Sequence, residues 1–217
     1  MLNAEKVRHW IKTLEQAKPD AQLQALTEIA RARDGLGEAK GDVGSPSAVR
    51  MQGAPASEGL NTLRNALIAR SSDANPAIRA EVVLALSVLG DVASLDVLRE
   101  ALNDVDPGVR LAAVAGLEEA GAADLESILL EVIKTEAEDS VRAEAILVLG
   151  RAQASPGMPI SLDEVTLGPV RSREAPAGSA TPTEMEDALS AVAEKDRSPY
   201  VRHLARMASR ARLNKSQ

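Results

Sequence analysis

Apolar residues recur along most of the chain at the spacing of an α-helix. Between residues 76 and 90 one stripe of apolar residues consists of Ile78, Val82, Leu86 and Leu89. Residues three and four apart share one face of a helix, so this spacing predicts a helix with one buried face. Stripes of the same kind predict further helices over residues 4–16, 20–33, 58–70, 93–103, 123–134 and 184–195.

The stretch from Asp73 to Gly90 recurs three times, over residues 104–121, 136–150 and 196–208. In every copy an acid stands six residues before an arginine. The four pairs are Asp73 and Arg79, Asp104 and Arg110, Glu136 and Arg142, and Asp196 and Arg202. The arginines are 31, 32 and 60 residues apart, and the last interval fits one repeat plus an insertion. A fixed period of this length predicts an array of helical repeats.

Turn residues mark where the repeated helices begin and end. A proline opens three of them, and the residue before each proline is a good N-cap: Asn75, Asp106 and Ser198. In the third copy Glu138 and Asp139 occupy the cap and proline positions, so the start of that helix is less sharply defined. Glycines follow the apolar stripes, and we expect them to end the helices in left-handed backbone: Gly90, Gly121 and Gly150.

Three segments depart from the regular repeat. Residues 4–33 form a degenerate first pair, in which aligning Pro19 with Pro76 puts Gln22 in the position of the arginine. Residues 34–57 and 152–183 are rich in Gly, Ser, Ala and Pro, which predicts two long loops. Each loop falls between the first and second helix of a pair, so both should leave the same rim of the array. This placement is compatible with two interpretations: the loops contact a partner, or they are insertions that the fold tolerates.

The residues of this motif resemble HEAT repeats, and most nearly the short HEAT-like repeats of the phycobilisome lyase type. The motif is D-x-x-P-x-V-R-x-x-A-x-x-A-L-x-x-L-G, as in Asp73, Pro76, Arg79, Leu86 and Gly90. The resemblance implies an all-α, HEAT-like α-solenoid of stacked antiparallel helix pairs, about ten helices in all. It also implies that the second helix of each pair lines a concave face. Family members are mostly binding scaffolds, and a few act on bilins, hypusine precursors or alkylated DNA.

On this interpretation the chain is a single domain over residues 1–217. Its expected parts are degenerate helices over 4–33, a flexible loop over 34–57, regular repeats over 58–151, a loop over 152–183 and a C-terminal helix pair over 184–213.

Cysteine content, apolar runs and net charge exclude or disfavour several classes of function. The chain has no Cys, which excludes disulfides, thiolate metal sites and a cysteine nucleophile. It lacks an apolar run of membrane-spanning length and begins without the apolar block of a secretory signal, so we expect a cytoplasmic protein with no membrane span. A net charge of -7 disfavours nucleic acid as a partner, because phosphate backbones attract basic surfaces.

The sequence offers no convincing catalytic, cofactor or metal residues. The motif DVDPG resembles the start of a calcium loop, but Ala115 stands where a bidentate glutamate is needed. His9 and His203 are the only histidines and lie near opposite ends of the chain. Phosphate-loop, dinucleotide-binding and nucleophile-elbow motifs are absent. We therefore expect no cofactor and no enzymatic activity. The repeated acid and arginine positions are interpreted as a structural ladder, since a buried arginine needs a partner.

The charged residues of the second helices are the best candidates for contacts with another protein. Those predicted to bind a partner are Asp96, Arg99, Glu100, Glu126, Glu131, Lys134, Glu186 and Asp187. Together with Glu194 and Arg64 they make a net acidic surface. That surface suits a basic segment, but it is also what solvated helices of an acidic protein look like. The final helix, 199–213, is basic instead, and it either caps the array or docks on an acidic protein or membrane surface.

The sequence therefore predicts a non-catalytic protein-interaction scaffold or adaptor that uses its concave face and rim loops. The alternative is a subunit of a bilin-lyase-like or other modifying enzyme. The identity of the partner and the oligomeric state do not follow from the sequence.

Overall fold

In this computed structural model, residues 4–16, 18–32, 55–152 and 181–213 are described. These ranges contain ten α-helices and no strand, which confirms the predicted all-α repeat fold. The described helices fall into two compact units, within residues 1–122 and 123–217. The expectation of one domain over residues 1–217 stays a prediction.

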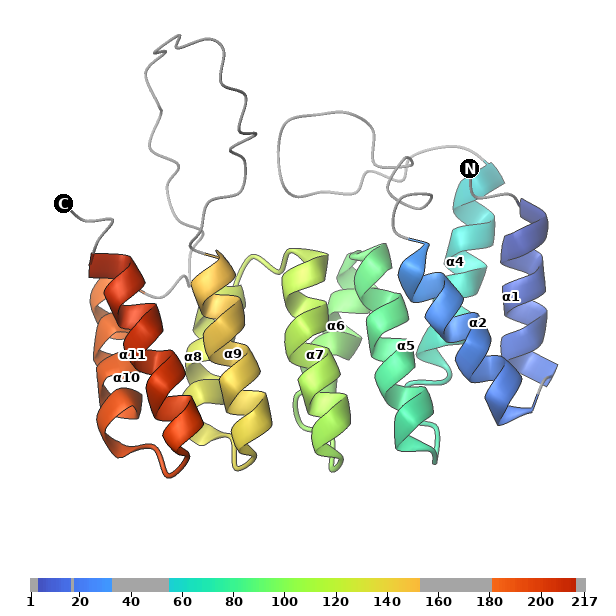
Figure 1. The fold of residues 1–217 in the computed structure, drawn as a ribbon. Helices are drawn as coiled ribbons and strands as arrows, with labels where there is room; N and C mark the ends of the chain where they lie inside the picture. Colours follow the sequence, from blue (N-terminus) through green and yellow to red (C-terminus); the bar gives the residue numbers. More distant parts are fainter. Residues whose placement is uncertain (1–3, 17, 33–54, 153–180, 214–217) are drawn as a thin grey trace, which may run out of the picture. The chain divides into compact units, whose positions relative to one another are not determined.

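The described part of the first unit contains six helices, and they lie in two layers (Figure 1). One layer holds α2 (Pro19–Arg31), α5 (Pro76–Leu89) and α7 (Pro107–Ala120), packed side by side in that order. The other layer holds α1 (Ala4–Gln16), α4 (Pro55–Ile68) and α6 (Val92–Ala101). Large aliphatic side chains fill the space between the layers and are fully buried, as the stripes predict: Leu26, Leu63, Leu86, Leu98 and Leu117.

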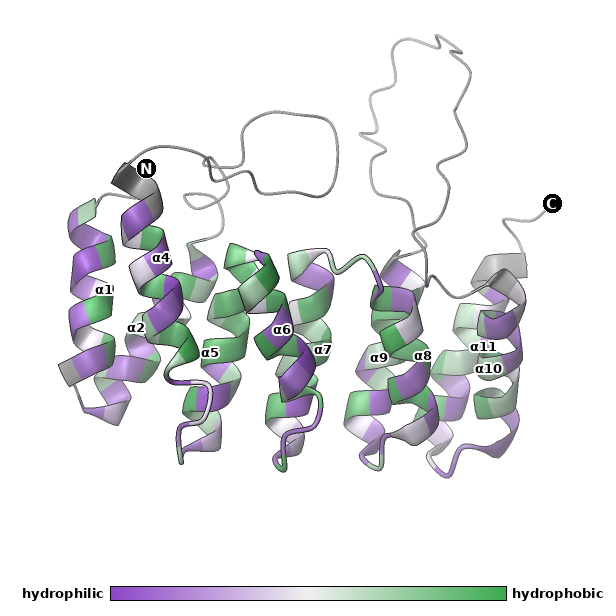
Figure 2. Cartoon of the chain, turned by 180° about the vertical axis from the view of Figure 1, so that it is seen from behind, coloured by the Kyte–Doolittle hydropathy of each residue, from purple (hydrophilic) through white to green (hydrophobic). Residues whose placement is uncertain are grey.

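The second unit consists of four helices arranged in the same way. α9 (Asp139–Ala152) packs on α11 (Pro199–Leu213), and α8 (Leu125–Thr135) packs on α10 (Pro182–Lys195). The two layers meet through α8 with α9 and through α10 with α11. Leu129, Ile146, Leu149, Leu189 and Val201 are buried between them. In Figure 2 hydrophobic and hydrophilic residues alternate along most of the helices.

The predicted N-caps are confirmed. The side chain of Asn75 accepts a hydrogen bond from the backbone N–H of Ala77, and that of Asp106 accepts one from Gly108. The Ser198 Oγ lies 3.5 Å from the backbone nitrogen of Val201 and accepts a long hydrogen bond from it. Each cap satisfies one of the free N–H groups of a first turn.

Two of the three predicted glycine stops are confirmed and one is wrong. Gly90 and Gly121 end α5 and α7 with φ angles of 60° and 69°, in left-handed backbone. Gly150 instead lies inside α9, which continues to Ala152 and is supported there by an ion pair of 2.9 Å between Arg151 and Glu144. Glycine accepts right-handed helical backbone as well as left-handed, so a glycine by itself does not end a helix.

Two helices begin earlier than the sequence pattern predicts. α4 begins at Pro55 rather than residue 58, and α10 begins at Pro182 rather than residue 184. Both have proline in the first turn, where its missing N–H costs no hydrogen bond. Thr181 and Glu184 form a capping box at α10, which explains the earlier start. The remaining parts of the predicted loops, residues 34–54 and 153–180, lie outside the described residues.

Candidate functional site

The repeated acids organise the turn before each first helix. Each carboxylate accepts a hydrogen bond from the backbone N–H two residues further on, at 2.7–2.9 Å. The backbone carbonyl of the same acid accepts one from the arginine six residues later, through Nη1. The arginines concerned are Arg79, Arg110, Arg142 and Arg202. Each acid therefore stabilises its own turn, and its backbone carbonyl positions the arginine.

The carboxylate partner of the arginine lies one repeat further along the chain. Arg79 donates to both oxygens of Asp104, at 2.8 Å through Nε and 2.7 Å through Nη2. Arg142 binds Asp196 in the same two-pronged geometry, at 2.8 and 2.9 Å. Planar pairs of this kind are stronger and more directional than single contacts. They join α5 to the turn before α7 in the first unit, and α9 to the turn before α11 in the second.

These ion pairs shift the pKa values of their members. The hydrogen bond from Arg79 is the largest cause that lowers the pKa of Asp104, and the N–H of Asp106 acts in the same direction. Burial raises the pKa of Asp196, but the hydrogen bonds from Arg142 and from the backbone of Ser198 outweigh it and lower the pKa. Both carboxylates are therefore held in the charged form, as expected for structural partners of arginine.

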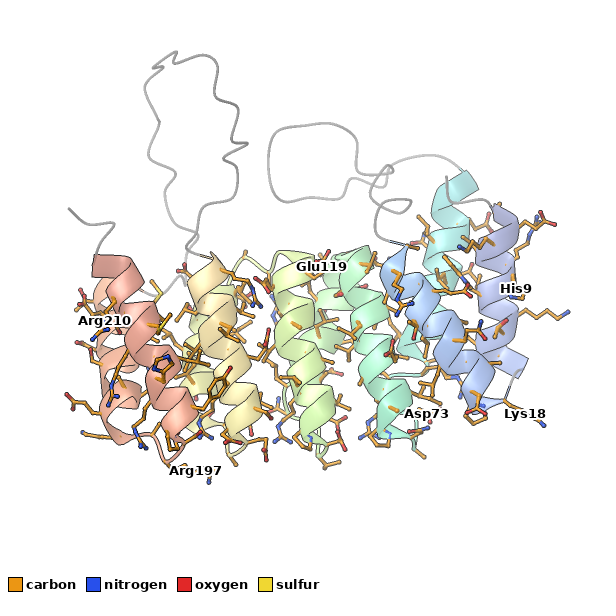
Figure 3. The ribbon with its side chains drawn as sticks, in the orientation of Figure 1. His9, Lys18, Asp73, Glu119, Arg197 and Arg210 are labelled. Carbon is orange, nitrogen blue, oxygen red and sulfur yellow. The ribbon has the colours of Figure 1, made fainter. Side chains whose placement is uncertain are left out.

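The degenerate first pair replaces the arginine by a neutral side chain. Gln22 is buried, and its Nε2 donates to the backbone carbonyl of Leu14 at 3.0 Å. Arg70, just after the end of α4, donates to the same carbonyl and also binds the carboxylate of Asp73 at 2.9 Å. Arg70 thus provides the positive charge that Gln22 lacks. Figure 3 labels Asp73 at the turn before α5.

Both aspartates of the calcium-like motif make structural hydrogen bonds. Asp104 is bound by Arg79 and by the N–H of Asp106, while Asp106 caps α7 through the N–H of Gly108. The two histidines belong to different units, with His9 on α1 and His203 on α11. Within the described ranges, no three His, Cys, Asp or Glu residues are grouped as metal ligands.

In the first unit, the predicted partner-binding residues lie on α6. Asp96 and Glu100 are exposed and Arg99 is partly exposed. Arg99 and Asp96 form a long ion pair of 3.5 Å along the helix. Arg64 of α4 binds Asp91, the N-cap of α6, at 2.8 Å. Internal pairing therefore neutralises much of the charge on this surface.

In the second unit, the predicted residues lie on α8 and α10. Glu131, Lys134, Glu186 and Asp187 are exposed, and Glu126 is partly exposed in the first turn of α8. Glu194, also exposed, adds a further acid to α10. No ion pair within the described part of the chain involves these four acids of α8 and α10 or Glu194. The face of α8 and α10 is consequently the more acidic of the two second-helix surfaces.

Two contacts at these surfaces went unnoticed at the level of sequence. The pair of Arg64 and Asp91 joins residues 27 positions apart, and nothing in the repeat motif relates them. The capping box of Thr181 and Glu184 does have a local signal, since its spacing of three residues is the one that capping boxes use.

The repeat geometry agrees with the comparison to known families. The family model of HEAT repeats matches residues 7–118 and 60–150, which together span more than half of the chain. The chain belongs to the HEAT-repeat family. No curated protein sequence is detectably similar to this HEAT-repeat chain. Among solved structures it is similar to a crystal structure described as an engineered protein, a Northeast Structural Genomics Consortium target. The two share 14% identity, each is covered over 98% of its length, and the TM-score is 0.48.

Membership in the HEAT-repeat family accounts for the ladder as a feature of the fold. The resemblance to the phycobilisome lyase type is a finer assignment, and family membership alone does not carry it. No described helix is both long and apolar enough to cross a membrane.

Proposed function

We propose that this HEAT-repeat chain is a non-catalytic scaffold or adaptor that binds a partner protein through its second helices. HEAT repeats commonly serve as protein-interaction scaffolds. The observation that carries the proposal is the exposure of four acids on α8 and α10, Glu131, Glu186, Asp187 and Glu194, against two exposed bases on the same helices, Lys134 and Lys195. This surface fits a basic segment of the partner.

The proposed mechanism has an electrostatic part and a conformational part. Unpaired acids attract a basic segment at long range and suppress acidic competitors. The helices behind them are held by buried leucines and by two-pronged arginine pairs, so little conformational entropy is lost on binding. We assign the long insertions, residues 34–54 and 153–180, to specificity in the same proposal. A cytoplasmic location fits it.

Charge reversal tests the proposal. The full chain and the triple variant E131K, E186K and D187K are used as bait in lysate of the native host, and recovered proteins are quantified by mass spectrometry. Loss of three attractive charges should lower recovery of a stoichiometric partner about tenfold. The matched control reverses three exposed acids outside the second helices: D20K, E138K and D139K.

A partner recovered equally by both variants would contradict the assignment to α8 and α10. A second variant, D96K with E100K, tests the contribution of the first unit separately. Its predicted effect is smaller, because Asp96 is already paired with Arg99.

The alternative function is a subunit of a bilin-lyase-like or other modifying enzyme. This alternative is supported by the resemblance of the repeats to those of the phycobilisome lyase type. Aromatic residues that could hold a tetrapyrrole are scarce, since Trp10 is completely buried and Tyr200 lies in the other unit. A preparation from the native host that contains no stoichiometric protein but shows visible absorbance would favour this alternative over the scaffold.

A further inference from the structure

A small cleft lies between α10 and α11 in the second unit. Its volume is about 300 Å³, and it is lined by Ser190, Ala193, Glu194, Arg206, Ser209 and Arg210. This size is at the lower end of the range for small-molecule sites. Figure 3 labels Arg210 on α11, in the half of that helix nearer its C-terminus.

In earlier repeats the corresponding positions are apolar. The position four residues after the ladder arginine is Val83, Val114 or Ile146 in the earlier repeats and Arg206 in the last one. The position seven residues after the arginine is Leu86, Leu117 or Leu149 in the earlier repeats and Ser209 in the last one. Six residues before the next ladder acid stand Leu67, Leu98 and Leu130, but Ser190. In the first unit one of these positions, Leu98, contacts the next helix: its side chain lies 3.2 Å from where a Cβ on Gly116 of α7 would be.

Polar residues at these positions are typical of a repeat that ends an array. A terminal position alone would not explain why the charges on the α11 side of the cleft have one sign. Arg206 and Arg210 are four residues apart, and like charges at this spacing destabilise a helix. An end surface of mixed charge would avoid that cost.

The donors around the cleft are only partly used. Arg206 donates from Nη2 to the backbone carbonyl of Ala193 at 3.1 Å, and this bond holds the side chain beside the cleft. The remaining N–H groups of its guanidinium can still donate to a ligand. Arg210 makes no hydrogen bond or ion pair with the described residues. The Ser209 Oγ is buried and has no partner within those same ranges.

We propose that this cleft binds a phosphate group. Arg206, Arg210 and Ser190 all line it, and arginine forks match the oxygens of phosphate. The site goes beyond the scaffold function and uses none of the acids reversed in the triple variant. Glu194 is the one acidic side chain in the lining and opposes an anion. The phosphate is carried either by a side chain of another protein or by a small phosphate ester.

The test is an NMR titration of the full isotope-labelled chain with inorganic phosphate at about pH 7.5, where phosphate is largely a dianion. Sodium chloride at matched ionic strength is the reference. We expect saturable shifts of amides in α10 and α11. R210Q should weaken binding about tenfold, since a charge-assisted hydrogen bond is lost. E194Q should tighten binding, and K195Q, which removes an equivalent exposed charge outside the cleft, should leave it unchanged.

The outcomes separate a site from general attraction to positive charge. Shifts that do not saturate, or equal losses in R210Q and K195Q, would overturn the proposal. Acetate that binds as tightly as phosphate would overturn the assignment to phosphate. Because E194Q is expected to strengthen binding, a failure to fold cannot imitate that result. Tighter binding of a phosphoserine peptide than of free phosphoserine indicates a protein as the source, and equal binding indicates a small ester.

Discussion

Replacing Asp104 by asparagine removes one charge from the ion pair that joins α5 to the turn before α7. Asparagine keeps an oxygen for the backbone N–H of Asp106, so the turn itself should persist. What is lost is the charge opposite Arg79, whose side chain is only 12% exposed, against 14% for Asp104. Exposed pairs contribute up to about 1 kcal/mol, and breaking a buried pair costs about 3–5 kcal/mol. We therefore expect the free energy of unfolding to fall by about 2 kcal/mol.

The assay is urea denaturation followed by tryptophan fluorescence. Trp10 is the only tryptophan, is completely buried and belongs to the same unit as the ion pair, so its emission reports the unfolding of that unit. A double-mutant cycle with R79Q isolates the pairwise contribution. The matched control is D106N, since asparagine and aspartate are equally good N-caps. A coupling energy between Arg79 and Asp104 below about 0.3 kcal/mol, within the usual error of additivity, would refute the reasoning.

Three further predictions use the same denaturation assay, with circular dichroism for the second unit. G121A should lower the free energy of unfolding by about 1 kcal/mol because the φ of Gly121 is 69°. G150A should raise it by up to about 1 kcal/mol because Gly150 is exposed in a helix with free space around it. Effects of the opposite sign would contradict the backbone conformations of these two glycines. L86A should cost about 3 kcal/mol, since Leu86 is completely buried, and a cost below about 1 kcal/mol would argue against this core. The pKa values of Asp104 and Asp196 are lowered in the folded chain, and this adds stability. The added stability is complete above the pKa of an unfolded aspartate, about 3.9, and is lost as the pH falls below it. The urea midpoint should therefore drop on acidification, and D104N should weaken that pH dependence.

The repeat, the helices and most of the buried positions follow from sequence, because period and apolar spacing are local properties. The partner of each ladder arginine does not. The motif places an acid six residues before Arg79, but only that acid's backbone carbonyl binds the arginine. The carboxylate comes from Asp104, because α5 and α7 lie side by side and bring the next turn to the end of the guanidinium.

The misassigned glycine has a similar cause. Gly150 comes after an apolar stripe just as Gly90 and Gly121 do, but only the latter two have positive φ. Whether a helix stops at a glycine depends on the contacts of the next residues, and in α9 the ion pair of Arg151 and Glu144 lies across the expected stop. Of the cleft residues, Arg206 and Arg210 stand out in the sequence only as basic positions of the final helix. That Arg206 replaces an apolar residue is seen only when it is aligned with Val83. This alignment is informative only if the positions that contact the next helix are known.

The proposed function places partner binding on the second helices. The most direct measurement is hydrogen–deuterium exchange of the full chain, alone and in complex with the partner recovered by the charge-reversal experiment. We predict slower exchange in α8 and α10, a weaker effect in α6, and no change in α5 and α9. Protection confined to the first helices, or no protection in α8 and α10 at saturating partner, would contradict it.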